Sequence, residues 1–230
     1  MMNTPAMVKV WDPAVRAFHW LLVAAFFIAY FTDEKDVRDI HVIAGYTVLA
    51  LVLFRVVWGF VGSRHARFSD FVGSPARAVR YALQAVKGTA ARHLGHNPAG
   101  GLMIMTLLLS LLGTTFTGLA VYGADQHAGP LAGFFAAGST DGEIAAAPAI
   151  PEMAKQAEED DDEAAEPGEH GERHAAGEGS DSDEIWEELH EFFANFTVFL
   201  VVIHVLGVFV ESRLHRENLA RAMVTGYKRA

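Results

Sequence analysis

The sequence predicts an all-α protein, a four-helix transmembrane bundle with a disordered acidic periplasmic loop. Three observations predict this class. Hydrophobic residues make up 51% of the 230 residues, the chain contains four long apolar runs, and most acidic residues gather in one stretch. A helix that crosses the hydrocarbon core of a bilayer needs about 20 mostly apolar residues, so runs of this length are typical of spanning helices.

The apolar runs set the expected organisation of the chain. They are Ala17–Phe31, Ile40–Val61, Gly100–Tyr122 and Phe192–Val210, the last extended backward to about Ile185. The first run is short and starts near the membrane interface. We therefore divide the chain into three parts. Residues 1–122 hold three helices and a basic loop at 62–99, residues 123–184 form the acidic loop, and residues 185–230 hold the fourth helix and a tail.

Two other interpretations of these runs are weaker. A signal peptide is disfavoured for the first run, because it contains His19 and Trp20 and is followed by acidic residues rather than a small-residue cleavage site. Four buried helices of a soluble protein are also disfavoured, because runs of this length with no lysine, arginine or acidic residue other than Arg55 exceed what soluble cores normally show.

Basic residues predict the orientation. The N-terminal tail, the 62–99 loop and the C-terminal tail carry thirteen Lys and Arg, whereas the opposite side carries only Lys35, Arg38, Lys155 and Arg173. Cytoplasmic loops of membrane proteins are enriched in Lys and Arg. Both termini and the 62–99 loop are therefore expected in the cytoplasm, and the acidic loop on the outer side.

The charge of the chain is unevenly distributed. Residues 124–184 hold seventeen Asp and Glu against Lys155 and Arg173, a net charge of −15, so the rest of the chain is mildly basic despite an overall charge of −10. High charge with few aromatics predicts disorder, and repulsion from phosphate argues against nucleic acid as a partner.

The chain has no cysteine, which excludes disulfides, thiolate-bound clusters and covalent c-type haem attachment.

Four histidines lie in the apolar runs: His19, His41, His190 and His204. Ionisable side chains at membrane depth are costly and usually functional, although each alone is compatible with a hydrogen bond between helices. His190 and His204 are 14 residues apart, so they share one helix face at a separation of about 21 Å. By depth, His19 pairs with His204 near the cytoplasm and His41 with His190 near the outside. Facing imidazoles on different helices are typical of a six-coordinate b-type haem.

Two further residues support this interpretation. Arg55 follows His41 by 14 residues on the same face, where a haem propionate would supply the anion that a buried arginine needs. The alternative is that Arg55 extends to the interface. Gly45 lies one turn after His41 and would let a flat macrocycle approach the helix. Gly113 and Gly118 allow the same, or close packing of helices.

These segments together resemble a known family. VWDPAVRAFHW, HVIAGYTVLALVLFRVVWGF, GHNPAGG and WEELHEFFANFTVFLVVIHV are similar to the bacterial cytochrome b561 family, which includes the b-type cytochrome subunit of nickel–iron hydrogenases. The likeness covers all four helices and not the acidic insert. It implies that His19, His41, His190 and His204 are axial ligands of two haems b, stacked across the bacterial inner membrane.

The resemblance also implies a function. The implied function is electron transfer between membrane quinone and a periplasmic redox partner such as a c-type cytochrome. Whether the protein also acts as an enzyme, a quinone oxidoreductase, stays open. An anchor subunit of a hydrogenase or dehydrogenase complex and a superoxide oxidase are alternatives, and the acidic loop disfavours the last because it would repel superoxide. A haem-free transporter is a more distant alternative. The partners expected are membrane lipid, quinone and the redox protein, and a homodimer is left open.

Overall fold

A computed structural model describes residues 6–32, 35–134 and 181–229, so most of the predicted acidic loop lies outside the described residues. The described chain is mostly helical. Four helices are long and apolar enough to cross a membrane, namely α1 (Pro13–Phe31), α2 (Arg38–Val61), α5 (Pro98–Gln126) and α7 (Asp181–Leu214, spanning from Glu184). The four predicted spanning helices are confirmed, and each begins at least two residues earlier than its apolar run, because caps and polar turns precede the apolar core.

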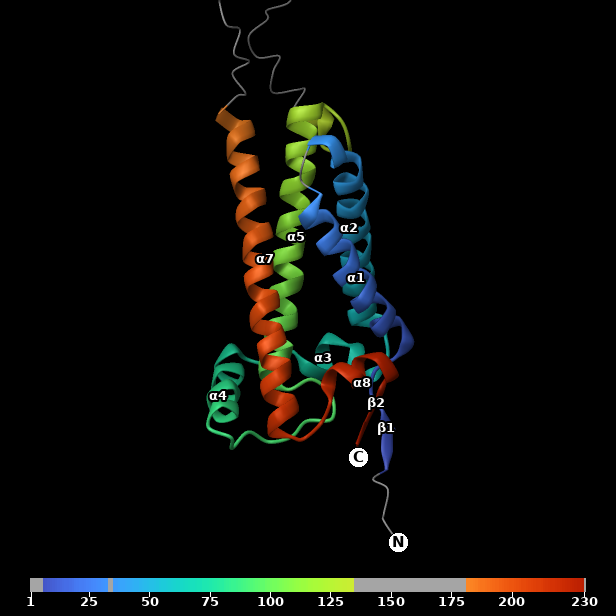
Figure 1. Ribbon diagram of the computed structural model, residues 1–230, viewed down its shortest axis with the longest axis vertical. Coiled ribbons are helices and arrows are strands. Elements are labelled where there is room, and N and C mark those ends of the chain that lie inside the picture. The colour runs from blue at the N-terminus through green and yellow to red at the C-terminus, as the bar shows by residue number, and fades with distance from the viewer. Residues whose placement is uncertain (1–5, 33–34, 135–180, 230) are drawn as a thin grey trace, which may run out of the picture.

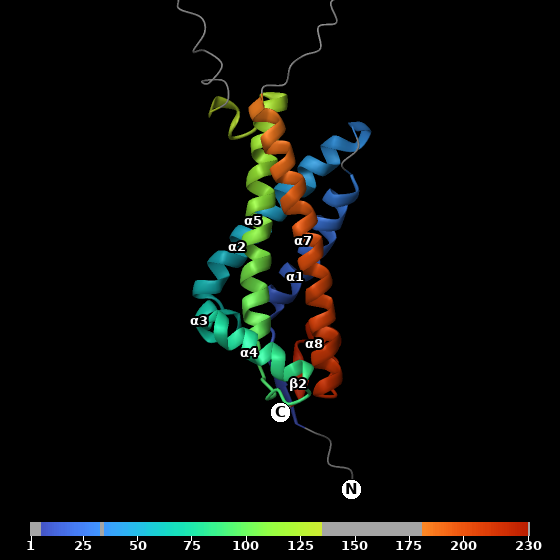
Figure 2. The same cartoon turned by 90° about the vertical axis from the view of Figure 1, so that its left-hand side faces the viewer.

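The long helices pack as two hairpins. α1 packs along α2, α5 packs along α7, and α2 joins the two hairpins through α5 (Figures 1 and 2). An apolar cluster at this junction includes Phe18 and Phe26 of α1, Val52 of α2 and Leu111 of α5. Most other large apolar side chains of the spanning helices point outward, which suits lipid as the surrounding medium.

A polar contact fixes α5 against α7 inside the bundle. The hydroxyl of Ser110 lies 2.7 Å from that of Thr197, and Thr197 is 1% exposed. Gly113 allows this close approach, because a Cβ there would lie 2.7 Å from the ring of Phe193 on α7. Small residues at such contacts are typical of packed membrane helices. Gly113 therefore serves helix packing, the second of the two roles considered for it.

Shorter elements gather at one end of the bundle. They are η2 (Arg64–Ala66), α3 (Phe68–Phe71), α4 (Pro75–Val86), α8 (Leu219–Thr225) and a two-stranded ribbon of β1 (Met7–Lys9) and β2 (Tyr227–Arg229), with η1 (Lys35–Val37) at the other end (Figure 1). The ribbon is antiparallel, with Val8 opposite Lys228. The all-α expectation did not include this ribbon, because three-residue strands carry no readable periodicity.

Ion pairs hold the ribbon and the 62–99 loop together at this end. Lys228 is 7% exposed, and its Nζ lies 3.7 Å from Glu217 Oε2 and donates to the carbonyl of His93 at 3.1 Å. Arg92 donates from Nε to the same Glu217 carboxylate at 2.9 Å. Burial lowers the pKa of Lys228, and the negative charge of Glu217 opposes that shift. The three regions predicted to be cytoplasmic thus form one cap, which we call the terminal cap.

Asp12 connects the terminal cap to the first helix. It is the N-cap of α1, and its carboxylate accepts from Val15 N at 2.8 Å, from Trp58 Nε1 at 3.2 Å and from the Ser63 hydroxyl. Burial tends to raise the pKa of Asp12, but these donors outweigh it and hold the pKa below its usual value. One side chain therefore caps α1 and ties it to the end of α2.

Asp12→Ala should lower the free energy of unfolding by about 1–2 kcal/mol, because it removes a helix cap and two hydrogen bonds between elements. Thermal unfolding of the detergent-solubilised protein measures this loss. Asp36→Ala, a change of an exposed aspartate in η1, is the matched control and should unfold like the wild type. Equal melting of both variants would contradict the role given to Asp12.

Candidate functional site

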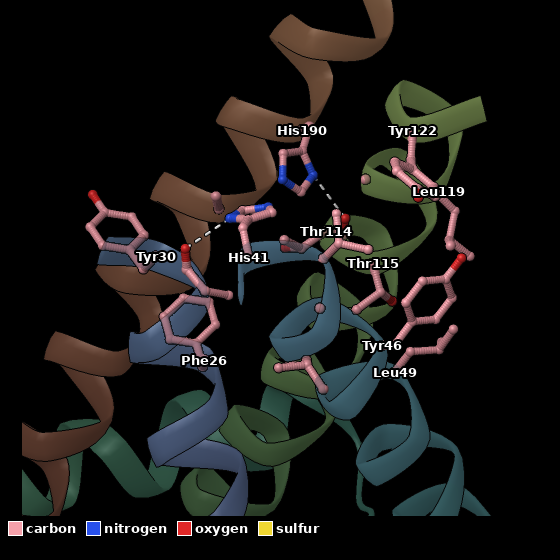
Figure 3. Close-up of a pocket in the computed structure, with 16 residues that line it drawn as sticks. Phe26, Tyr30, His41, Tyr46, Leu49, Thr114, Thr115, Leu119, Tyr122 and His190 are labelled. Atoms are coloured by element: carbon pink, nitrogen blue, oxygen red, sulfur yellow. Dashed lines mark hydrogen bonds between the residues drawn. The ribbon is translucent and has the colours of Figure 1, made fainter. Parts of the chain in front are cut away.

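The outer histidine pair meets between the two hairpins. His41 extends from the first turn of α2, and His190 from the outer third of α7 (Figure 3). Their ring centroids are 6.0 Å apart and the ring planes are inclined by 76°. Two imidazole nitrogens that bind one metal at about 2 Å each place the ring centres about 6 Å apart. The spacing of these rings therefore matches that of two axial ligands of one metal.

Hydrogen bonds orient both rings from within their own hairpins. The Nδ1 of His41 lies 2.9 Å from the carbonyl of Ala29 on α1, and the Nδ1 of His190 lies 2.9 Å from the carbonyl of Thr114 on α5. A carbonyl accepts only, so each Nδ1 carries the proton and each Nε2 carries the lone pair. Histidines that bind metals usually donate their other N–H in this way. The pair is therefore oriented for coordination through Nε2.

The two rings line one cavity. It encloses about 690 Å³ including its open mouth, and the side chains that line it are almost all apolar or aromatic. Gly45 lies in this wall, and a Cβ added there would meet nothing within 4 Å. Gly118 faces His190, because a Cβ there would lie 2.9 Å from the imidazole. Gly45 thus leaves open space beside His41, into which a flat ligand would fit. Gly118 makes room for the imidazole ring of His190.

The inner histidine pair lies nearer the terminal cap. His19 and His204 are close enough to interact electrostatically, although their rings are not in contact as those of the outer pair are. Both are only half-buried, and the Nδ1 of His19 is buried without a hydrogen-bond partner among the described residues. A buried ring nitrogen without a partner is rare in folded proteins, and among the described residues this ring lacks the orienting hydrogen bond that each ring of the outer pair makes.

Arg55 is buried at the same end and does not reach the interface. It is 3% exposed, its guanidinium lies 5.0 Å from the centroid of the Phe68 ring, and its Nη1 has no partner among the described residues. This placement argues against the alternative in which the side chain extends to the interface. A buried cation without an ion pair among the described residues favours an anionic ligand, and haem carries two propionates.

Sequence reasoning missed the residues of α5 that support the outer site. Thr117 and Thr114 lie one turn apart and contact His190 through the Thr117 hydroxyl at 3.2 Å and the Thr114 carbonyl. Hydroxyl residues one turn apart in an apolar helix were a readable signal, but they did not indicate which histidine they face. Two tryptophans also lie near the polar residues of the bundle: Trp58 donates to Asp12, and Trp20 packs edge-on against His19.

Comparisons with known proteins place the chain in a family. The family described as prokaryotic cytochrome b561 matches residues 10–226. The chain is 29% identical over 159 residues to a probable Ni/Fe-hydrogenase B-type cytochrome subunit of Azotobacter vinelandii, an alignment of 55% of this chain and 66% of that relative. It is 28% identical over 143 residues to the subunit of the same description in Azotobacter chroococcum mcd 1, covering 50% and 59%.

The matched regions thus span less than two thirds of the length of either relative. No solved structure matches the chain. The family match covers nearly the whole chain, all four spanning helices and all four histidines of the two pairs. The chain therefore belongs to the prokaryotic cytochrome b561 family and is a multi-pass membrane b-type cytochrome of electron transfer.

Proposed function

We propose that the protein binds two haems b and carries electrons across the bacterial inner membrane between quinone and a periplasmic redox partner. The observation that carries this proposal is the outer pair, in which His41 and His190 face each other at 6.0 Å with both Nδ1 atoms held by carbonyls. Haem supplies one-electron chemistry when bound, and the protein supplies the ligands, their orientation and a medium of low dielectric.

The second haem rests on the inner pair and on the geometry of α7. His190 and His204 lie four turns apart on one continuous helix. His204 therefore presents its ring on the same side of α7 as His190 but at the depth of His19 and Arg55. We infer that His19 and His204 are the axial ligands there and that Arg55 pairs with a propionate. Two haem sites about 21 Å apart along the helix axis would divide the electron's path across the membrane into two shorter steps.

The orientation and the periplasmic partner follow from charge. The terminal cap contains most of the basic residues outside the spanning helices, so the positive-inside rule places it in the cytoplasm and the outer histidine pair toward the periplasm. The 124–184 segment, with its net charge of −15, then extends into the periplasm. Such a field would attract a basic soluble protein such as a lysine-rich c-type cytochrome.

The Azotobacter relatives favour a second candidate function. Both are described as hydrogenase cytochrome subunits, so this chain is alternatively the membrane anchor of a larger redox complex. The two functions share the haem sites and differ in the partner. Stable co-purification of a second redox subunit would favour the anchor, whereas salt-sensitive and transient exchange with a soluble cytochrome favours the carrier.

His204→Ala should remove one haem and leave the other, because only the inner pair loses a ligand. A reduced-minus-oxidised visible spectrum with haem quantified per chain measures this, and we expect two haems in the wild type and one in the variant. His19→Ala should remove the same component as His204→Ala, and His41→Ala the other. If His19→Ala and His41→Ala abolished the same spectral component, the pairing would be wrong.

Gly45→Leu should prevent binding of the outer haem, because the new side chain would fill the space beside His41. Gly207→Leu is a matched control, since Gly207 is also helical and its added Cβ also meets nothing within 4 Å, but it lies on α7 outside the cavity lining. We expect one haem in the first variant and two in the second. Full haem content in both would refute the use of Gly45 by a macrocycle.

Replacing the thirteen Asp and Glu within residues 141–178 by Asn and Gln should slow electron exchange with a basic soluble cytochrome about tenfold or more at low salt, because it removes electrostatic steering. Stopped-flow kinetics across ionic strengths measures the effect, which should vanish at high salt. The length of the loop and the haem content stay the same, so they serve as internal controls. Equal rates at all salt concentrations would exclude docking through this loop.

A further inference from the structure

Unpaired buried polar atoms concentrate at the end of the bundle that carries the terminal cap. Among the described residues, those without a hydrogen-bond partner are Arg16 Nε, His19 Nδ1, Arg55 Nη1, His96 Nδ1 and His215 Nε2. Folded proteins pair more than nine in ten such groups. Arg55 is accounted for by a propionate of the proposed inner haem. His96, which lies in the 62–99 loop, is not.

His96 occupies a fixed position under the bundle. Its ring lies between those of Trp11 and Phe71, with ring centroids 4.5 Å apart and planes inclined by 51° in both contacts. The next residue, Asn97, caps α5 by accepting from Gly100 N at 2.7 Å. Gly101 brings the start of α5 against Phe71, whose carbonyl would lie 2.6 Å from an added Cβ. Two aromatic rings and a helix cap thus hold the imidazole in one place.

Phe71 also connects His96 to Arg55. The Arg55 guanidinium lies 5.9 Å from the centroid of the Phe71 ring that His96 contacts. Burial lowers the pKa of His96 to about 3, and the positive charges of Arg55, Lys228, His65 and His204 contribute. His96 is therefore a neutral imidazole with one N–H to donate, and the Arg55 guanidinium, which approaches the same Phe71 ring, only donates.

A carboxylate would satisfy both groups. Arg55 has no ion pair with an acid among the described residues, and the carboxylate of nearby Asp12 already accepts from Val15 N, Trp58 and Ser63. A quinone carbonyl would accept a hydrogen bond from His96 but would leave the charge of Arg55 uncompensated. An anion with two oxygens compensates the charge and accepts from both donors.

We propose that His96 donates a hydrogen bond to a propionate of the inner haem and, together with Arg55, forms the carboxylate-binding site for that group. This inference rests on the proposed His19–His204 haem. His96 is a positioning residue here, since it contacts the edge of the cofactor and not the iron. Its hydrogen bond disperses propionate charge and thereby favours the reduced haem.

His96→Phe tests the proposal, because phenylalanine keeps the packing between Trp11 and Phe71 and removes the N–H. His93→Phe is the matched control in the same loop, since the half-buried His93 ring packs against Tyr81 and its Nδ1 contacts the carbonyl of Ala91. Redox titration of the purified holoprotein should show the midpoint potential of the inner haem falling by about 59 mV, a tenfold change in the ratio of oxidised to reduced haem. The outer haem and the control should not change.

Resonance Raman spectra provide a second readout, because the propionate bending band of the inner haem should shift in His96→Phe. Wild-type apoprotein loaded with haem dimethyl ester, whose propionates carry no charge, should instead show a raised inner potential, and His96→Phe should not change that potential further. An unchanged inner potential and Raman band, an equal shift of both haems, or a raised quinone KM with unchanged potentials would each overturn the proposal. Absence of the inner haem from wild-type protein would instead refute the proposed function itself.

Discussion

Two imidazoles that face each other from different helices constrain the whole bundle. His41 and His190 lie on different hairpins, yet their centroids are only 6.0 Å apart. Each ring is oriented by a carbonyl of its own hairpin, Ala29 of α1 for the first and Thr114 of α5 for the second. Each hairpin therefore sets the direction of its own ligand, and the contact of α2 with α5 only has to bring the two together. This arrangement suits a cofactor that binds between two hairpins, each of which already orients one histidine.

The two ends of the bundle differ in their chemistry. At the outer end the cavity wall is almost entirely apolar or aromatic, and the polar atoms near the rings are carbonyls and hydroxyls. At the inner end a buried guanidinium and a buried imidazole nitrogen lack partners among the described residues, and the terminal cap closes over them with Lys228 and Arg92 around Glu217. The inner end is therefore the more electropositive of the two.

Much of the site was readable from single helices. The 14-residue separation of His190 and His204 and the equal separation of His41 and Arg55 follow from helical geometry alone. Gly45 was readable for the same reason. The residues contributed by neighbouring elements were not readable. The carbonyl of Thr114 carries no signal in its side chain, Gly118 resembles any packing glycine, and His96 lies in a loop whose return under the bundle depends on Phe71 and Trp11.

The sequence by itself determined the number of spanning helices, their approximate limits and the candidate ligands, because apolar length and helical spacing are local properties of the chain. Depth in the helices also indicated which imidazoles would face each other, but only the tertiary structure decided which ring nitrogen His41 and His190 present and that Arg55 is buried rather than extended to the interface. It also decided the pairing of β1 with β2, which joins the two ends of the chain. These features depend on contacts between residues far apart in the sequence, whose geometry is set by packing and by hydrogen bonds that no local pattern encodes.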